Sequence, residues 1–368
     1  MATASHRAFV PKADTIACWQ VFWLIPIHRA FPFHWWNSGY CGGVEDLQLR
    51  EQLPGWTGFP FHSRRIGKPS RGAKCSRLSW PGMTTPAYDL RPLDLSAEGL
   101  AQVNTLLRLV FPHATHYSEA LLRWQYVDNP DGLAVGYNAW AGEELAAHYV
   151  TIPMRALVHG REERGLLSLN TATAPTHQGK GLFTRLAEAT YRAGAEQGFG
   201  FVVGVANANS THGFTKKLGF QLVSPLRAMV GIGSLPLRPD GGNVQFAPMH
   251  SEAKLRWRTA HPAHVYTLAA QPHMWTVLSP KRMKGARFVL ATGLGGAPRL
   301  VLRKEKAPAL KAWIGLDPSM AWTSSAYLNV PMRLRPSPLN MIFKDLSGAA
   351  RKLDASKVRM EAIDFDVL

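Results

Sequence analysis

The sequence predicts an α/β fold in which strands and helices alternate, followed by a smaller α+β domain. Three observations predict it. Residues 88–220 switch repeatedly between strand-like and helix-like apolar patterns. A glycine-rich turn at residues 178–183 stands between a β-branched apolar run and a helix-patterned segment. A stretch rich in Gly and Pro, residues 233–242, separates this part from a second, strand-rich part.

The first elements follow one another closely. Residues 88–93 have the pattern of a strand. Apolar residues at helical spacing predict a helix over residues 97–110, which Asp94 or Ser96 can cap. A second helix, which Ser118 can cap, is expected to end at Tyr126.

A hairpin, a strand and a helix come next. The turn at residues 129–132 leads into a hairpin whose strands are residues 133–140 and 145–154. Residues 166–173 are the next strand, and residues 182–198 have a helical pattern. A strand, a glycine-rich turn and a helix in this order place unpaired N–H groups at a helix N-terminus, which is an anion site.

Three phosphate-binding motifs can be compared with Gln-Gly-Lys-Gly-Leu-Phe at residues 178–183. A P-loop places its lysine after the second glycine, whereas Lys180 lies between Gly179 and Gly181. A dinucleotide fingerprint needs a third glycine where Thr184 stands. The third motif is Gln/Arg-x-x-Gly-x-Gly/Ala, which this turn matches except at its last residue.

The flanking segments indicate which of the three motifs this turn belongs to. Leu169 to Pro175 is a strand that ends in proline, and Gly198 to Asn207 is a second strand pattern. Asn209-Ser210 then opens a helix that closes with Lys217-Leu218-Gly219-Phe220. With the turn, these motifs resemble the GNAT acyltransferases over residues 86–233. The resemblance implies a mixed central sheet flanked by helices, and acetyl-CoA or another acyl-CoA as co-substrate.

The resemblance also implies which residues contact the coenzyme. The end of the fourth strand would pair with the pantetheine arm, and the turn would donate N–H groups to the pyrophosphate. Carried over to this sequence, these residues are Thr171, Ala172, Thr173, Gln178, Gly179, Lys180, Gly181, Leu182, Phe183 and Asn209. Lys180 is equally well explained as a solvated side chain, and we favour a helix cap for Asn209.

The catalytic residues are not predicted by the resemblance. Many GNAT members have a tyrosine that protonates the thiolate, and the corresponding position here holds Thr215, beside Phe214. Weak candidates for proton transfer are Ser210, Thr215, His148 and Glu119. Tyr149 and His116 lie on segments that can also face the acceptor, although each of these residues is more often a core or surface residue.

Composition limits the other classes of function. The chain has 368 residues and a net charge of +17, of which residues 246–368 carry +11 and residues 83–245 none. This basic part can indicate an anionic partner, although we favour its interpretation as a solvated surface. We find no metal-ligand spacing, nucleic-acid motif or membrane span. The three cysteines fit a reducing cytoplasm, and no oligomeric state is predicted.

The predicted domains are uneven in character. Residues 1–82 show no sustained period, and we interpret them as an irregular extension rather than a folded domain, with Met83 as the working start; an aromatic-rich binding arm is the alternative. Residues 234–245 form a linker. Residues 246–368 form a C-terminal α+β domain, either a degenerate second GNAT-like half or an unrelated substrate domain. Leu255-Arg256-Trp257 repeats Leu122-Arg123-Trp124, which favours the first interpretation.

Two functions are therefore predicted from the sequence. The first is an N-acetyltransferase that transfers acetyl from acetyl-CoA to a primary amine of a small molecule, for which the large second part would wall the acceptor pocket. The alternative is a non-catalytic acyl-CoA-binding or regulatory protein. The missing tyrosine favours the alternative slightly, and the glycine turn favours the enzyme more strongly.

Overall fold

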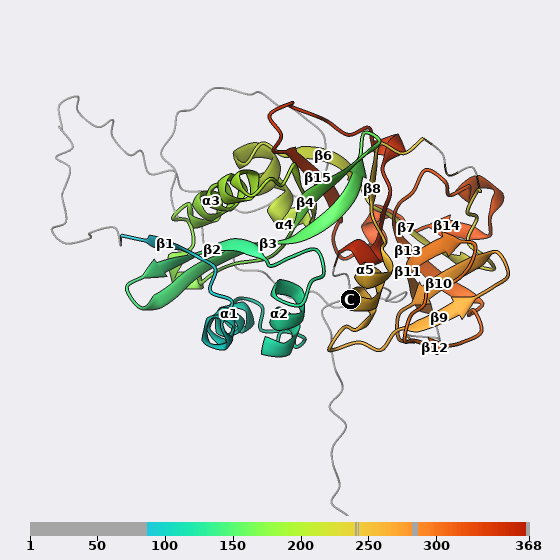
Figure 1. Cartoon of the computed structure of the whole chain (residues 1–368), viewed down its shortest axis with the longest axis horizontal. Helices are drawn as coiled ribbons and strands as arrows, with labels where there is room; N and C mark the ends of the chain where they lie inside the picture. The colour runs from blue at the N-terminus through green and yellow to red at the C-terminus, as the bar shows by residue number, and fades with distance from the viewer. Residues whose placement is uncertain (1–86, 240, 242, 282–285, 366–368) are drawn as a thin grey trace, which may run out of the picture. The chain divides into compact units, whose positions relative to one another are not determined.

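The computed structural model describes residues 87–239, 241, 243–281 and 286–365, all of which belong to one compact unit of the chain. The predicted N-terminal extension and its three cysteines lie outside these residues. Within the described part, the strands form two sheets of eight strands each (Figure 1).

The first sheet has the predicted mixed α/β character. Its order is β1-β2-β3-β4-β5-β15-β6, with β8 beside β3. Only β4 and β5 run parallel, and all other neighbours are antiparallel. The strands are β1 (Asp89–Pro92), β2 (Val135–Ala141), β3 (Glu144–Val158), β4 (Arg161–Thr173), β5 (Phe201–Ala206), β6 (Gln221–Pro225), β8 (Phe246–Pro248) and β15 (Asn340–Asp345).

Helices cover both faces of this sheet. α1 (Ala97–Val110) and α2 (Glu119–Tyr126) lie on one face, and α3 (Leu182–Glu196) lies on the other (Figure 1). Ser96 and Ser118 cap α1 and α2 as predicted, because each hydroxyl accepts a hydrogen bond from a first-turn N–H group. α4 (Ala208–His212) follows β5.

The second sheet follows the order β12-β9-β10-β11-β13-β7-β14, with β16 beside β13. One helix of the second part, α5 (Glu252–Thr259), precedes β9. The strands are β7 (Arg227–Ile232), β9 (Thr267–Ala270), β10 (Met274–Leu278), β11 (Arg287–Leu294), β12 (Arg303–Lys304), β13 (Leu310–Leu316), β14 (Tyr327–Asn329) and β16 (Met360–Glu361).

The two sheets share one topology. In the first, the antiparallel strands β2, β3 and β4 are followed by parallel β5 and then by antiparallel β15 and β6. In the second, the antiparallel strands β9, β10 and β11 are followed by parallel β13 and then by antiparallel β7 and β14. This repeated order supports the interpretation of the second part as a GNAT-like half. It lacks a counterpart of α3 among the described residues.

The halves exchange one strand each. After β6 the chain crosses to the second sheet, where β7 lies between β13 and β14. It returns briefly as β8 beside β3, and again after β14, where β15 lies between β5 and β6. The predicted linker at residues 234–245 therefore does not divide the sheets, because the crossing falls at Leu226, between the end of β6 and the start of β7. No pattern in the sequence indicates the exchange, because neither β7 nor β15 differs in its apolar pattern from a strand that stays in its own sheet.

The two short helices form the contact between the halves. Ser118 to Gln125 and Ser251 to Arg258 are identical at six of eight positions. Trp124 and Trp257 stack with ring centroids 4.7 Å apart, and each indole N–H donates to the other residue's carbonyl oxygen at 2.8 Å. This two-fold arrangement shows that the sequence repeat is structural, and both halves contribute to one hydrophobic core.

We expect Trp257→Ala to lower the free energy of unfolding by about 3–5 kcal/mol, because it removes a buried aromatic ring and leaves the Trp124 carbonyl oxygen without its indole donor. Urea denaturation followed by circular dichroism measures the change. Trp140→Ala is the matched control, since Trp140 is half-buried on β2 and should cost less. Equal losses of free energy of unfolding in the two variants would show that the contact between α2 and α5 contributes no more to stability than a half-buried tryptophan does.

Candidate functional site

The parallel strands β4 and β5 separate before they end. Their pairing extends only to Ser168 opposite Gly204. β4 continues to Thr173 and β5 to Ala206, with no pairing between them in the described structure. The other edge of β4 is paired with β3. The last residues of β4 therefore keep backbone groups available to a ligand that enters between the strands.

A β-bulge in β4 accounts for this separation. The register with β3 shifts near His148, where β4 contains one residue more than β3. Asn170 in the bulge has φ +45°, a left-handed conformation that asparagine adopts more readily than most residues. A bulge bends its strand and increases the local twist. The predicted coenzyme contacts Thr171, Ala172 and Thr173 follow it along the open edge.

The glycine turn lies directly after this edge. Gly179 and Gly181 have φ values of +73° and +72°, and a side chain at either would meet no protein atom within 4 Å. Gly181 is the N-cap of α3, whose first backbone bond joins Arg185 N–H to Gly181 O at 3.2 Å. The N–H groups of residues 179–183 have no backbone acceptor in the described structure. These unpaired N–H groups lie at the positive end of the helix dipole.

The other turn residues divide into two groups. Gln178 and Lys180 are exposed, and Gln178 Nε2 donates to Thr173 O at 3.4 Å, which links the turn to the end of β4. Leu182 is buried, and the ring of Phe183 packs edge-on against Phe214, with centroids 5.2 Å apart. Leu182 and Phe183 can therefore contribute backbone groups, whereas their side chains belong to the core.

The helix cap after β5 differs from the prediction. Asn207, not Asn209, caps α4, because its Oδ1 accepts hydrogen bonds from the N–H groups of Asn209 and Ser210 at 3.0 Å each. The hydroxyl of Ser210 accepts from Asn207 N–H at 3.1 Å in return. The Thr215 hydroxyl donates to Thr211 O at 2.9 Å. Both candidate hydroxyls thus hold the helix, and a coenzyme contact by exposed Asn209 stays a prediction.

His148 is fully buried and cannot exchange protons readily with an acceptor. Its Nδ1 lies 2.8 Å from Asn138 Oδ1, and its Nε2 lies 3.2 Å from the Tyr126 hydroxyl. Burial lowers the pKa of His148 to about 3, so the imidazole is neutral at physiological pH. Since an amide oxygen only accepts, Nδ1 carries the proton and Nε2 accepts from Tyr126. The predicted general base is instead a fixed acceptor.

This fixed imidazole orients Asn170 in the bulge. Because the Tyr126 proton is donated to His148, the Tyr126 oxygen accepts from Asn170 Nδ2 at 2.9 Å. The same Nδ2 donates to Gln125 Oε1 at 2.7 Å. Both amide hydrogens of Asn170 are thereby used, so its Oδ1 is held as an acceptor, with the Tyr117 hydroxyl 3.4 Å away. The amide oxygen cannot turn away without breaking both bonds.

Sequence reasoning missed this polar network. It gave Asn170 no role in the site. An asparagine inside a strand pattern was the available signal, because asparagine is unfavourable in strands and favoured at positive φ.

The remaining candidates for proton transfer differ in their exposure to solvent. Glu119 is exposed at the start of α2. Tyr149 is buried on the α3 side, where burial raises its pKa and its hydroxyl bonds to Ser168 and Tyr191 at 2.8 and 2.6 Å. The ring centroid of His116 lies 4.4 Å from that of Tyr117, whose hydroxyl lies 3.4 Å from Asn170 Oδ1. Only His116 and Glu119 remain accessible to solvent.

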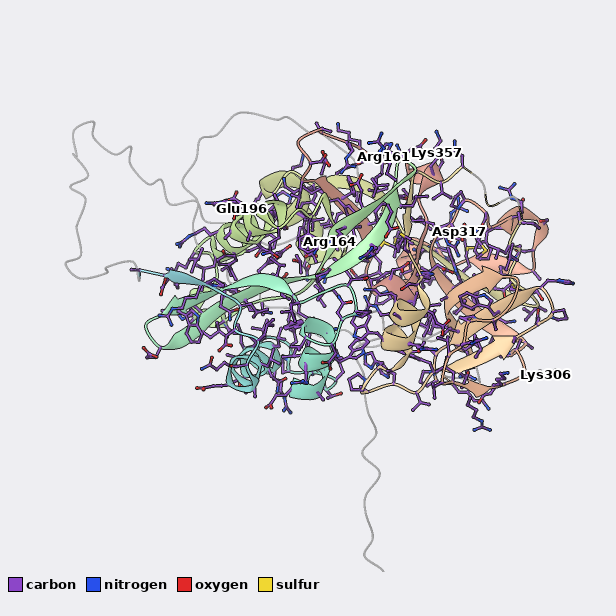
Figure 2. All side chains as sticks on the ribbon, viewed as in Figure 1. Arg161, Arg164, Glu196, Lys306, Asp317 and Lys357 are labelled. Carbon is purple, nitrogen blue, oxygen red and sulfur yellow. The ribbon has the colours of Figure 1, made fainter. Side chains whose placement is uncertain are left out.

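The second sheet has a cleft of the same kind, but the chain itself fills it. β11 and β13 also separate after a short parallel pairing. β16 enters there, with Glu361 opposite Gly315 of β13, while the Glu361 carboxylate accepts from Thr292 N–H of β11 at 3.0 Å. Arg359 lies 3.5 Å from Asp317, which follows β13 and is labelled in Figure 2. The second cleft is therefore closed to a coenzyme arm.

The described residues contain neither a candidate metal centre nor a candidate membrane-spanning helix. No group of three or more His, Cys, Asp or Glu side chains there is arranged to hold a metal ion. Among the same residues, no helix is both long and apolar enough to cross a bilayer.

Three solved structures are similar to this chain over about 70% of its length. A GCN5-related N-acetyltransferase from Anabaena variabilis ATCC 29413 is similar with a TM-score of 0.50 and 13% identity, over 70% of this chain and 73% of that chain. A conserved protein of unknown function from Enterococcus faecalis V583, described as a probable N-acyltransferase, has a TM-score of 0.49 and 10% identity, over 71% and 73%. For Eis1 from Mycobacterium abscessus the values are 0.45 and 14%, over 71% and 74%.

Comparison with sequence families locates the domain. No curated protein matches the chain significantly. A family model described as an acetyltransferase (GNAT) domain matches residues 91–223. This range holds the separated strands, the bulge and the glycine turn, so these features lie within the part of the chain that matches a GNAT acetyltransferase domain.

Proposed function

We propose that the protein is an acyl-CoA-dependent N-acyltransferase, which transfers acetyl from acetyl-CoA to a primary amine of a small molecule. One observation carries the proposal: the open edge of β4 is followed, after the 3-10 helix Pro175–His177, by a turn at the N-terminus of α3 whose N–H groups have no backbone acceptor among the described residues. A thioester on a long arm with a pyrophosphate at its far end fits such an edge and turn.

The coenzyme would lie with its pyrophosphate on the N–H groups of residues 179–183 and its arm along Thr171 to Thr173. The close approach requires Gly179 and Gly181, because their conformation is left-handed and a side chain would point into the ligand. Lys180 is exposed beside the pyrophosphate position and would add a positive charge.

The reaction would take place at the bulge, where the strands separate. A backbone N–H of β4 would donate to the thioester oxygen, which gains charge as the amine attacks. The Asn170 Oδ1 would accept a hydrogen bond from the amine. This bond would direct the lone pair of the amine nitrogen at the carbonyl carbon of the thioester. The C–N bond forms, the C–S bond breaks, and solvent would take the amine proton and protonate the thiolate.

A non-catalytic acyl-CoA-binding protein is the second candidate. The observation that favours it is the side-chain chemistry near the expected thiolate, where Phe214 is buried and the Thr215 hydroxyl is bonded to the helix. Consumption of acetyl-CoA in the presence of a panel of primary amines separates the two functions. We propose a cytoplasmic location together with the first function, the N-acyltransferase.

Gly181→Asp should abolish coenzyme binding, because it places bulk and negative charge against the pyrophosphate. We expect the Kd for acetyl-CoA, measured by calorimetry, to rise at least a hundredfold. Gly160→Asp is the matched control, since Gly160 also has positive φ, +79°, and open space around it, but lies in the β3–β4 turn. A folded Gly181→Asp variant with wild-type affinity would refute this position of the site.

The chain should bind one coenzyme, because the second cleft is filled by β16 and lacks the glycine turn. Calorimetric titration with acetyl-CoA is expected to give a stoichiometry of one per chain, and Gly181→Asp should remove the whole signal rather than half. A second binding event that survives in Gly181→Asp would contradict this assignment.

Asn170→Gly should raise the KM for the amine about tenfold and leave the Kd of acetyl-CoA unchanged, because it removes one hydrogen bond to the acceptor while glycine tolerates the positive φ. Steady-state kinetics and calorimetry together test the split. Ala350→Gly, at φ +52° on the surface, controls for the backbone change. If acetyl-CoA affinity falls as much as amine affinity, Asn170 shapes the strand rather than the acceptor site.

A further inference from the structure

A short 3-10 helix, Pro175–His177, connects the open end of β4 to the glycine turn. It begins after Ala174, whose N–H donates to Ala146 O of β3 at 2.9 Å. After it, the N–H of Gln178 reaches back to Pro175 O at 3.5 Å, which is long for a hydrogen bond. Backbone bonding therefore holds the chain only loosely at the point where it enters the turn.

The side chain of His177 fixes this connection to the rest of the first half. The residue is buried, and its Nδ1 lies 2.9 Å from the Tyr88 hydroxyl. The two rings meet edge-on, with centroids 5.6 Å apart. Tyr88 directly precedes β1 and packs against the core that contains Leu182 and Leu186 of α3. His177 is thus tied to the same core as the helix on the other side of the turn.

The second ring nitrogen of His177 faces a carboxylate. Its Nε2 lies 3.2 Å from Glu144 Oε1 at the start of β3, but it has no partner in hydrogen-bond geometry among the described residues. Because the Glu144 side chain is largely exposed, this contact contributes little free energy. With the Nε2 proton toward the carboxylate, Nδ1 accepts from the Tyr88 hydroxyl. The bond to Tyr88 is therefore the contact that anchors His177.

The glycine turn needs such an anchor because its own residues cannot order it. Gly179 and Gly181 have positive φ and no side chains, and glycine has more backbone freedom to lose than any other residue. A ligand that must itself order the N–H groups of residues 179–183 loses affinity. The buried Leu182 fixes the turn from the side of α3, and His177 fixes it from the side of β4.

We infer that His177 is a positioning residue for the coenzyme. Through its bond to the Tyr88 hydroxyl, it holds the N–H groups of the glycine turn in the arrangement that binds the pyrophosphate. This inference rests on the proposed function, and it gives the residue before β1 a part in coenzyme binding. The effect is confined to ligands that carry the pyrophosphate, because the pantetheine arm would lie along β4 instead.

His177→Phe keeps a buried ring and removes the bond to Tyr88. We expect the Kd for acetyl-CoA, measured by calorimetry, to rise about tenfold, because the ligand must then order the turn. The affinity for S-acetylpantetheine, which has no pyrophosphate, should stay within twofold of wild type in ligand-observed NMR titrations. His177→Asn should restore most of the acetyl-CoA affinity, because its amide can take the place of Nδ1. His273→Phe, in the exposed β9–β10 turn, is the matched control.

Tyr88→Phe removes the same bond from its other end. It should cause the same loss of acetyl-CoA affinity, and combining it with His177→Phe should add nothing, because both variants delete one interaction. It also provides the test should His177→Phe fail to fold by circular dichroism.

Wild-type affinity for acetyl-CoA in a folded variant, or an equal loss for S-acetylpantetheine, would show that the inference is wrong while the proposed function stands. If the wild-type chain does not bind acetyl-CoA, the proposed function itself fails, and the inference fails with it.

Discussion

The bulge in β4 is the feature on which the rest of the site depends. It separates β4 from β5, exposes backbone groups along an edge that would otherwise be paired, and turns Asn170 toward α2. A left-handed asparagine is a strained element, and such strain persists only where the surroundings hold it. Here the surroundings are the buried chain of Asn138, His148 and Tyr126, whose hydrogen bonds have one consistent direction.

The two halves use the same framework for different purposes. The first keeps the cleft between its parallel strands open and adds the glycine turn and α3. The second closes its cleft with β16 and the carboxylate of Glu361. The likeness of α2 and α5 in sequence and in their reciprocal tryptophan contacts shows how closely the halves correspond despite this division.

Local patterns predicted the first half well. The helix over residues 97–110, the serine caps and the turn at residues 178–183 follow from apolar spacing and capping chemistry, which are properties of neighbouring residues. The strand exchange and the Asn170 network were not predictable in this way, because they depend on partners distant in sequence. The cap at Asn207 was misplaced by two residues, since Asn207 and Asn209 have the same capping chemistry and only the backbone distinguishes them.

The strand exchange also constrains how the chain can fold during synthesis. β5 is produced early, yet its neighbour β15 is the second-to-last strand of the sequence. The edge of β5 that β15 covers thus stays unpaired until nearly the whole chain has left the ribosome, and contacts between such distant segments form slowly. An exposed strand edge in such an intermediate is open to pairing with other chains, so we expect incomplete chains of this protein to associate more readily than completed ones.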